Sequence, residues 1–342
     1  MNTLVKQGHP TFLACRHNSA MLEPDRISAQ ITTFPLPFRN EIDLLTAWQI
    51  AKIVKKHEID ILHAHTAHAH TMAWLARKFA GRGKVLVSRR VDFAPKQKWI
   101  NKIKYDSPDH YIAISRKIAE IISEFGIPEE KISVVYSAIE PKRFEVEGLR
   151  RDALPSSVDG PLLGNVAALV GHKDQQTLIR SMALVLKEIP DARLVIAGEG
   201  PLRQMLESLI VSLGLSEYVY LLGHRNDIPA LLNTLDVFIM SSKEEGLCTS
   251  ILDAMAAGTP VAATAGGGIP EIVRSEQTGL LAPIGDHAAL AKNIVRLLND
   301  PSLCSSLKTN ATHMLHESFT LEKMVSGNLA VYEQLAGKSH QN

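Results

Sequence analysis

The segment Ser241-Ser-Lys-Glu-Glu-Gly-Leu-Cys-Thr-Ser-Ile-Leu-Asp-Ala-Met-Ala-Ala-Gly-Thr-Pro260 lies between two short apolar runs. These runs, Asp236–Met240 and Pro260–Thr264, predict buried strands. Between them the chain turns through Gly246 and opens a helix near Ser250. A strand, a loop, a helix and a second strand in this order predict two parallel strands joined by a crossover helix.

The same alternation continues outward through the chain. Short apolar or β-branched runs predict strands at Ile59–Leu62, Lys84–Val87, His110–Ile114, Ser133–Tyr136, Leu162–Val166, Arg193–Ala197 and Tyr218–Leu222. Amphipathic stretches lie between them, and Asp43–His57 places its apolar residues on one stripe. We therefore expect an α/β protein whose sheets are parallel and covered by helices on both faces.

The chain of 342 residues is long enough for two domains of ordinary size. Residues 145–161 contain prolines and glycines but little apolar periodicity, which predicts a linker. We expect a first domain over residues 1–150, a linker over 151–160 and a second domain over 161–325. A C-terminal helix over 320–337 is expected to pack back toward the first domain.

The sequence starts inside a predicted element. Leu4–Gly8 has the pattern of a helix end, and Thr11–Cys15 that of the strand after it. A doubly wound domain normally has a strand and a Gly-rich turn before such a helix. We therefore expect the first domain to lack its opening strand and Gly-rich turn.

The formal net charge of +1 conceals a division between the two halves. Residues 1–158 hold 24 basic and 17 acidic side chains, whereas residues 159–342 hold 13 and 19. The near-neutral total argues against a nucleic-acid partner. The basic first half indicates an anionic partner or surface for that half alone.

The cysteines argue for a reducing compartment. Cys15, Cys248 and Cys304 form no Cys-x-x-Cys pair, which disfavours a zinc knuckle or a redox dithiol. The N-terminus lacks the pattern of a signal peptide. The charge-poor stretch Leu247–Pro270 is interrupted by glycine and proline. We expect a cytoplasmic protein that contacts the inner face of the plasma membrane peripherally.

Two carboxylates flank the turn in the segment quoted above. Glu245 precedes the predicted helix and Asp253 lies within it. Backbone N–H groups at a helix N-terminus suit an anion, and a carboxylate beside them can accept hydrogen bonds from sugar hydroxyls. A capped helix with a solvated Glu245 is the alternative interpretation of the same residues.

Four histidines fall within eight positions of the first half, in Leu62-His-Ala-His-Thr-Ala-His-Ala-His70. His63 and His65 end a predicted parallel strand, where ligands gather in open α/β sheets. Two more histidines are expected on the next helix, and no acidic ligand is close by in the sequence. No metal site is therefore expected, and no Asp-x-Asp pair occurs anywhere in the chain.

The densest basic run is Ser88–Lys104, in which Trp99, Ile100 and Ile103 alternate with lysines. Such a run suits an anionic bilayer or an anionic acceptor. A solvated helix face is the alternative. The candidate residues on the acceptor or membrane side are Arg89, Arg90, Lys96 and Lys98.

Glu245, seven residues, Asp253 and then Ala254-Met-Ala-Ala-Gly-Thr-Pro-Val261 resemble the signature of retaining family 4, or group 1, glycosyltransferases. Further landmarks of that family match, in order, Ala113–Ser115, Gly126–Pro128, Lys131–Ser133, Arg143–Phe144, Gly164–Lys173, Ala197–Arg203, Gly266–Glu271 and Thr278–Pro283. The resemblance implies a GT-B fold, with two doubly wound domains facing a cleft. It also implies metal-independent, retaining transfer of a hexose from a nucleotide-diphosphate sugar, such as a UDP-sugar, to a glycan or lipid-linked acceptor. A cell-envelope product such as a lipopolysaccharide core is expected, and no cofactor.

The resemblance assigns roles to residues. His65 and Glu245 are implied as catalytic, with Glu245 on the donor sugar hydroxyls. Lys173 would hold the donor phosphates and Asp253 the ribose, where the family usually has glutamate. A second phosphate cation usual in the family is replaced by Ala168. Further donor contacts are implied at Gly246, Thr249, Ser250 and Arg225.

Other function classes remain open at this point. A catalytically impaired relic or a nucleotide-sugar-binding regulatory protein follows if the expected strand and Gly-rich turn are absent. An NAD-linked dehydrogenase is disfavoured, because Arg203 stands where the third glycine after Gly198 and Gly200 belongs. A nucleotide-sugar epimerase shares the fold class, but Glu245 and Asp253 fit it less well.

Overall fold

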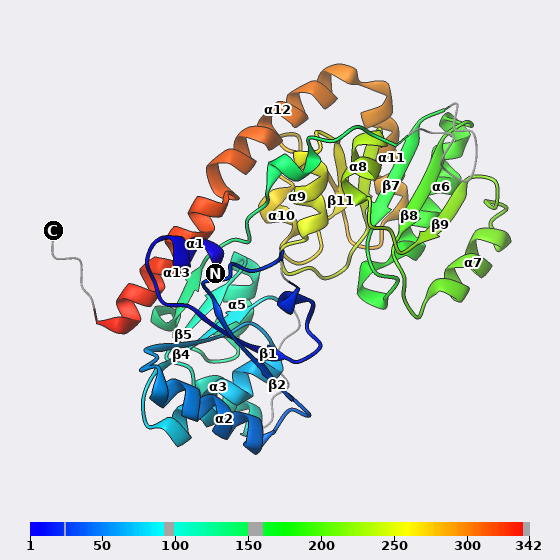
Figure 1. The fold of residues 1–342 in the computed structure, drawn as a ribbon. Helices are drawn as coiled ribbons and strands as arrows, with labels where there is room; N and C mark the ends of the chain where they lie inside the picture. The colour runs from blue at the N-terminus through cyan, green and yellow to red at the C-terminus, as the bar shows by residue number, and fades with distance from the viewer. Residues whose placement is uncertain (24, 92–98, 150–159, 338–342) are drawn as a thin grey trace.

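The computed structural model describes residues 1–23, 25–91, 99–149 and 160–337 and contains two α/β domains (Figure 1). The elements of the first are α1 (Asn2–Lys6), β1 (Phe12–Arg16), β2 (Thr32–Leu36), α2 (Leu44–Lys56), β3 (Ile61–Ala64), α3 (Ala67–Ala80), β4 (Lys84–Arg89), α4 (Trp99–Asp106), β5 (His110–Ala113), α5 (Arg116–Glu124) and β6 (Ile132–Val134).

The strands of the first domain pair in parallel, as predicted, but they form two sheets. β1 pairs with β2, and β3, β4, β5 and β6 follow one another in a four-stranded sheet. Within the described residues no ladder joins the two sheets. β1 and β3 are therefore both edge strands, a feature that the alternation of strands and helices in the sequence does not predict.

The second domain is built around one parallel sheet. Its elements are β7 (Leu162–Val166), α6 (Gln175–Glu188), β8 (Arg193–Ala197), α7 (Arg203–Ser212), β9 (Val219–Gly223), α8 (Ile228–Thr234), β10 (Val237–Met240), α9 (Thr249–Ala256), β11 (Val261–Thr264), α10 (Ile269–Ile272), β12 (Leu280–Ala282) and α11 (His287–Asn299). The strand order is β12-β11-β10-β7-β8-β9. Because the order reverses beside β7, loops diverge there at the carboxyl ends of the strands, where ligands bind in open α/β sheets.

Local chemistry sets the helix starts. Asp43, Thr66 and Ser115 each precede a helix, and each side chain accepts a hydrogen bond from a backbone N–H of the first turn. This bond satisfies a donor that has no partner within the helix. Ser115 caps α5, and Gly126, with φ +110°, follows the end of this helix.

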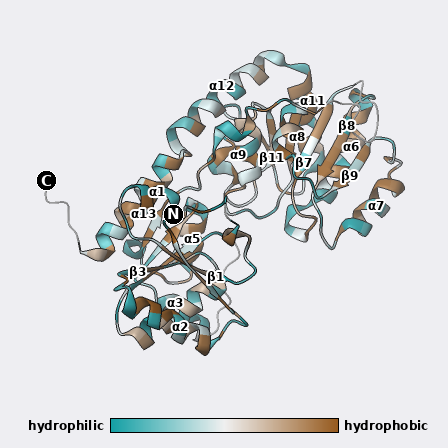
Figure 2. Cartoon of the chain, viewed as in Figure 1, coloured by the Kyte–Doolittle hydropathy of each residue, from teal (hydrophilic) through white to brown (hydrophobic). Residues whose placement is uncertain are grey.

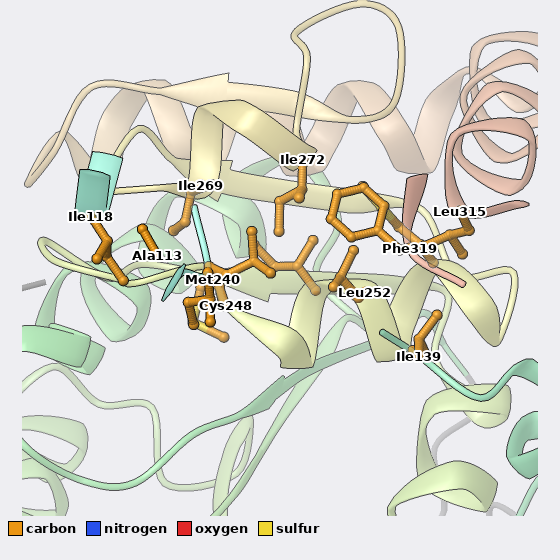
Figure 3. Close-up of a cluster of buried hydrophobic side chains, with 14 of the residues drawn as sticks. Ala113, Ile118, Ile139, Met240, Cys248, Leu252, Ile269, Ile272, Leu315 and Phe319 are labelled. Carbon is orange, nitrogen blue, oxygen red and sulfur yellow. The ribbon is translucent and has the colours of Figure 1, made fainter. Parts of the chain in front are cut away.

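The largest hydrophobic cluster crosses from one domain to the other (Figure 3). Ala113 and Ile118 of the first domain belong to the same buried cluster as Met240, Leu252 and Ile269 of the second. A separate cluster, containing Leu178 and Leu290, fills the opposite face of the second sheet. Figure 2 shows the matching pattern, with apolar strands in the second sheet and helices such as α2 that are apolar along only one part of their surface.

Two C-terminal helices connect the domains. α12 (Pro301–Ser318) runs along the second domain, and α13 (Leu321–Ala336) lies on the first (Figure 1). Between them the carbonyl of Phe319 accepts a hydrogen bond from Ile139 N at 2.9 Å. Val331 of α13 is buried with Leu86 and Val135, so the last helix supplies part of the core of the first domain.

A carboxylate of the second domain caps a helix of the first. Glu271, in α10, accepts hydrogen bonds at 2.9 Å from the backbone N–H groups of Arg116 and Lys117, which begin α5. The hydroxyl of Tyr136 donates to the same carboxylate at 2.9 Å. Burial and this carboxylate raise the pKa of Tyr136 to about 12, so the hydroxyl keeps its proton. Three hydrogen bonds to an anion at a helix N-terminus therefore fix the two domains to each other.

We predict that Glu271→Ala lowers the free energy of unfolding by about 1.5–3 kcal/mol, the usual range for hydrogen bonds to a charged group. Urea titration followed by circular dichroism measures the change. The matched control is Glu276→Ala, which removes an exposed ion pair with Arg296 and is expected to cost less than about 1 kcal/mol. Equal losses in both variants would contradict a structural role for the Glu271 contact.

Candidate functional site

A buried ion pair joins two loops at the carboxyl ends of β7 and β10. Glu245 lies in the loop after β10 and is only 7% exposed. Its Oε1 accepts hydrogen bonds from Lys173 Nζ at 2.5 Å and from Ser242 Oγ at 2.7 Å. An isolated carboxylate at this depth would be costly, and the contacts with Lys173 and Ser242 offset that cost.

Three glycines shape the loop that carries Glu245. A Cβ on Gly266 would lie 2.2 Å from the carbonyl oxygen of Ser242, and one on Gly267 would lie 2.2 Å from that of Glu245. The N–H of Gly268 donates to the carbonyl of Glu245 at 2.8 Å. The Gly266-Gly-Gly268 run therefore packs directly against the Glu245 loop, because any side chain at these positions would collide with the backbone of that loop.

A second glycine pair supports the loop that carries Lys173. A Cβ on Gly198, whose φ is +144°, would lie 2.0 Å from the carbonyl oxygen of Ala167, and one on Gly200 would lie 2.4 Å from that of Leu169. The N–H of Leu169 donates to the carbonyl of Glu199 at 3.0 Å. The loops after β7 and β8 therefore pack backbone against backbone, and Lys173 sits at the end of this assembly.

The N-terminus of α9 adds hydrogen-bond donors to the same place. Its first residue is Thr249, which is exposed, and Ser250 is half-buried. The first N–H groups of a helix have no partner within it, and they carry partial positive charge. Cys248, just before the helix, has φ +61°, and its buried thiol has a raised pKa because of desolvation and the nearby charge of Glu245. The thiol therefore stays protonated at neutral pH.

Asp253 and Arg225 are two further candidate donor contacts that lie on separate elements of the second domain. Asp253, in α9, is half-buried, and desolvation raises its pKa to about 6, against the opposing charge of Arg143. Arg225, after β9, forms a two-pronged ion pair with Asp227 at 2.8 and 2.5 Å. Any contact of Arg225 with a ligand has to compete with this pair.

The loops of the first domain meet these loops directly. Arg90 follows β4, and a Cβ on Gly246 would lie 2.8 Å from its carbonyl oxygen. A Cβ on Gly268 would lie 3.3 Å from Ser115 Oγ, just after β5. The carboxyl ends of the two parallel sheets therefore face each other across Gly246 and Gly268.

His65 occupies the residue directly after β3, on this same edge of the first sheet. Desolvation, followed by the positive charge of Arg90, lowers the pKa of His65 to about 4. Its imidazole is thus neutral at pH 7 and can both donate and accept a hydrogen bond. Arg90 itself is exposed, and its guanidinium donates to Ser137 Oγ at 3.3 Å.

Some candidate residues do not reach this edge. Arg89 is only 6% exposed, and its guanidinium donates to Tyr105 Oη at 2.5 Å and to the carbonyl of Val91 at 3.1 Å. The expectation that Arg89 faces an acceptor or a membrane is therefore wrong, because β4 extends through Arg89 and turns its side chain inward. Lys96 and Lys98 lie outside the described residues.

The four histidines separate in the fold. The rings of His63 and His65 contact each other at a tilt, with centroids 4.1 Å apart, whereas His70 is buried edge-on against Tyr105. Within the part of the chain that the structure describes, no group of three or more metal-binding side chains converges. A cavity of about 410 Å³ lies at the opposite, amino ends of the second sheet, beside Asp191 and Pro260, away from Glu245.

Sequence reasoning missed three residues that contact the site or its supports. Ser242 directly follows β10 within the quoted segment, so its position was a usable signal. Glu271 is the last residue of the Gly-Gly-Gly-Ile-Pro-Glu motif. This motif pointed to the family, but it did not predict the contact of Glu271 with α5. Tyr332, which hydrogen-bonds to His63 at 2.7 Å, stands 269 residues from its partner and has no local signal.

Comparison with known proteins gives a consistent result. The family model for group 1 glycosyl transferases matches residues 149–314, and that for glycosyltransferase family 4 matches residues 1–143. The putative glycosyltransferase EpsD of Bacillus subtilis is 33% identical over 284 residues, covering 76% of this chain and 72% of EpsD. N-acetyl-alpha-D-glucosaminyl L-malate synthase of Bacillus anthracis is 27% identical over 301 residues, covering 85% of this chain and 78% of that protein.

A relative named for a lipopolysaccharide step and a solved structure extend the comparison. The lipopolysaccharide core biosynthesis glycosyltransferase LpsE of Rhizobium meliloti is 28% identical over 298 residues, covering 85% of this chain and 82% of LpsE. The crystal structure of Anabaena HepE in complex with UDP has a TM-score of 0.79 at 22% identity and covers 95% of this chain and 92% of HepE. No helix within the described ranges has the length and apolar character needed to cross a bilayer.

The facing parallel sheets, the Glu245 loop and these matches agree, and the chain belongs to the group 1, family 4 glycosyltransferases with the GT-B fold.

Proposed function

We propose that this chain transfers a hexose from a nucleotide-diphosphate sugar, with retention of configuration and without a metal ion, to a glycan or lipid-linked acceptor of the cell envelope. The observation that carries the proposal is the Lys173–Glu245 ion pair at the facing edge of the two sheets. The ammonium group of Lys173 suits the diphosphate of the donor, and the carboxylate of Glu245 suits the hydroxyl groups of its sugar.

The pair accounts for donor binding as an exchange of partners. When the donor enters, its diphosphate replaces Glu245 as the partner of Lys173. Glu245 Oε1 is then free to accept a hydrogen bond from a sugar hydroxyl, and Ser242 keeps the carboxylate in place. The N–H groups that begin α9, at Thr249 and Ser250, add donors for phosphate oxygens where Ala168 offers no cation.

The reacting groups then have defined tasks. The bond between the sugar C1 and the diphosphate oxygen breaks, and the bond from C1 to the acceptor oxygen forms on the same face. The acceptor proton passes to an oxygen of the leaving diphosphate. Lys173 and the α9 N–H groups stabilise the charge that develops on the diphosphate, which is the main electrostatic contribution. His65, neutral at pH 7, positions the sugar from the first domain.

The acceptor class rests on charge and on relatives. Residues 1–158 carry an excess of basic side chains, and on α4 the indole of Trp99 is 75% exposed beside the exposed Lys102. LpsE, similar over most of this chain, is named for lipopolysaccharide core biosynthesis. A basic, partly apolar face on the acceptor-side domain suits a lipid-linked anionic acceptor and peripheral contact with an anionic bilayer.

We predict that Glu245→Ala lowers the turnover number by about 10²–10³-fold, because a transition-state contact is lost. The same variant keeps or increases the rise in melting temperature caused by UDP, since Lys173 no longer has a competing partner. Glu244→Ala, an exposed neighbour, is the matched control and is expected to behave like the wild type. Full transferase activity in Glu245→Ala would sink the assignment, and wild-type protein that binds UDP without turnover would favour the impaired relic.

A second prediction concerns Asp253 and pH. Its folded pKa of about 6 exceeds the ordinary value near 4, so the folded state binds the extra proton between these values, and the ionised buried form destabilises the fold above pH 6. We expect Asp253→Asn to raise the free energy of unfolding by about 2 kcal/mol at neutral pH and by nearly nothing near pH 4. Urea titrations at several pH values measure this, and the exposed Asp25→Asn serves as the control. A gain that does not depend on pH would contradict the raised pKa.

The membrane contact is tested by vesicle sedimentation. We expect binding to vesicles that contain phosphatidylglycerol and release at about 0.5 M salt, since screening weakens exposed charges. Lys102→Glu on α4 should weaken binding, whereas Lys292→Glu on α11 of the second domain should not. Equal binding to neutral vesicles at high salt would refute the charge-driven contact.

A further inference from the structure

The imidazole of His63 is held between two hydroxyl groups. Nδ1 lies 2.7 Å from Tyr332 Oη, and Nε2 lies 2.7 Å from Ser88 Oγ. Burial lowers the pKa of His63 well below its usual range, so the ring is neutral. A neutral imidazole has one N–H donor and one acceptor nitrogen, so one hydroxyl donates to the ring and the other accepts from it. With both nitrogens occupied, the ring cannot rotate without losing a hydrogen bond.

His63 in turn packs against the candidate catalytic histidine. The two rings have centroids 4.1 Å apart and an angle of 35° between their planes. His65 is the single residue between the end of β3 at Ala64 and Thr66, whose side chain caps the N-terminus of α3, so its backbone is held on both sides. The face of the fixed His63 ring therefore limits which orientations the His65 ring can take.

Tyr332 comes from α13, and that helix is anchored against the first domain. A Cβ on Gly327 would lie 2.9 Å from Val135 Cγ1, and Val331 is buried with Leu86 and Ile112. Burial raises the pKa of Tyr332 to about 12, so its hydroxyl keeps its proton near neutral pH. The ring of Tyr332 also meets His63 edge-on, with centroids 5.6 Å apart. The hydroxyl thus acts as a fixed hydrogen-bond partner and not as an acid or base.

We propose that Tyr332 is a positioning residue, whose hydroxyl fixes the orientation of the His65 ring through the doubly hydrogen-bonded His63. The proposal rests on the proposed function of His65 in sugar transfer. It assigns to α13 an indirect role at the reacting centre, which acts through His63 and His65.

The test compares Tyr332→Phe with the wild type. The substitution keeps the ring that packs on His63 and removes the hydroxyl alone. We expect the turnover number to fall by about 10-fold, because small displacements of a positioning group are costly, while KM for the donor sugar stays the same. The rise in melting temperature caused by UDP should also stay the same, since the Lys173 loop is not involved. Ser88→Ala, which removes the opposite partner of His63, should act in the same direction.

A spectroscopic readout separates positioning from stability. In protein with ¹³C-labelled histidine, the ring resonances of His63 and His65 are expected to shift in Tyr332→Phe. The matched control is Tyr220→Phe, which removes a hydroxyl that donates to the carbonyl of Glu217 at 2.7 Å in the second domain. It should leave both resonances and the turnover number unchanged.

The outcomes are distinct. Wild-type turnover in Tyr332→Phe, or a loss of turnover without a shift of the His65 resonance, overturns the proposal. A lower melting temperature as the single effect also overturns it, since Tyr332 would then act only as a structural contact. If the wild type transfers no sugar at all, the proposed function fails, and the His65 resonance alone still decides whether Tyr332 orients this ring.

Discussion

A buried carboxylate needs a partner, and this requirement explains how the loops of the second domain are arranged. Glu245 is neutralised by Lys173, which lies 72 residues earlier in the chain, so the loops after β7 and β10 have to meet. Each loop is then supported from behind by glycines that admit no side chain, Gly198 and Gly200 in one case and Gly266 to Gly268 in the other. The glycine motifs and the ion pair depend on each other. The glycines let the loop backbones pack closely, and this packing brings Lys173 and Glu245 together where little water reaches them.

The two domains are joined by apolar burial and by polar contacts of different character. The shared hydrophobic cluster, to which the first domain contributes Ile118 and the second Ile269, holds the domains together, but apolar burial does not fix their relative orientation. The hydrogen bonds from α5 to Glu271 fix that orientation, since both oxygens of the carboxylate bond to the helix N-terminus and a rotation of one domain would break these bonds. Gly246 and Gly268, which lie against Arg90 and Ser115, are within this contact region. The geometry of the site therefore depends on the relative position of the domains as much as on either domain alone.

Much of the fold could be predicted because strands in α/β proteins are short apolar runs with clear ends. The predicted strands Leu162–Val166 and Arg193–Ala197 agree with β7 and β8 to the residue. Resemblance placed Glu245 and Lys173 in one site, and the structure brings them into contact. What could not be predicted depends on contacts between distant residues. Arg89 is buried because its guanidinium bonds to Tyr105, and the first domain has two sheets because of how its strands pair. Glu271 and Tyr332 contact residues that are 135 and 269 positions away in the sequence, Tyr136 and His63. Periodicity describes one element at a time and carries no information about such pairs.

The return of α13 to the first domain has a consequence for biosynthesis. Val331 completes a core that begins with Leu86, so the first domain lacks part of its interior until α13 has been translated. Domains usually fold in the order in which they leave the ribosome. Here the second domain can become compact first, while the sheet of β3 to β6 still exposes the apolar surface that α13 will cover. The nascent chain is therefore prone to aggregation until α13 has left the ribosome and covered this surface.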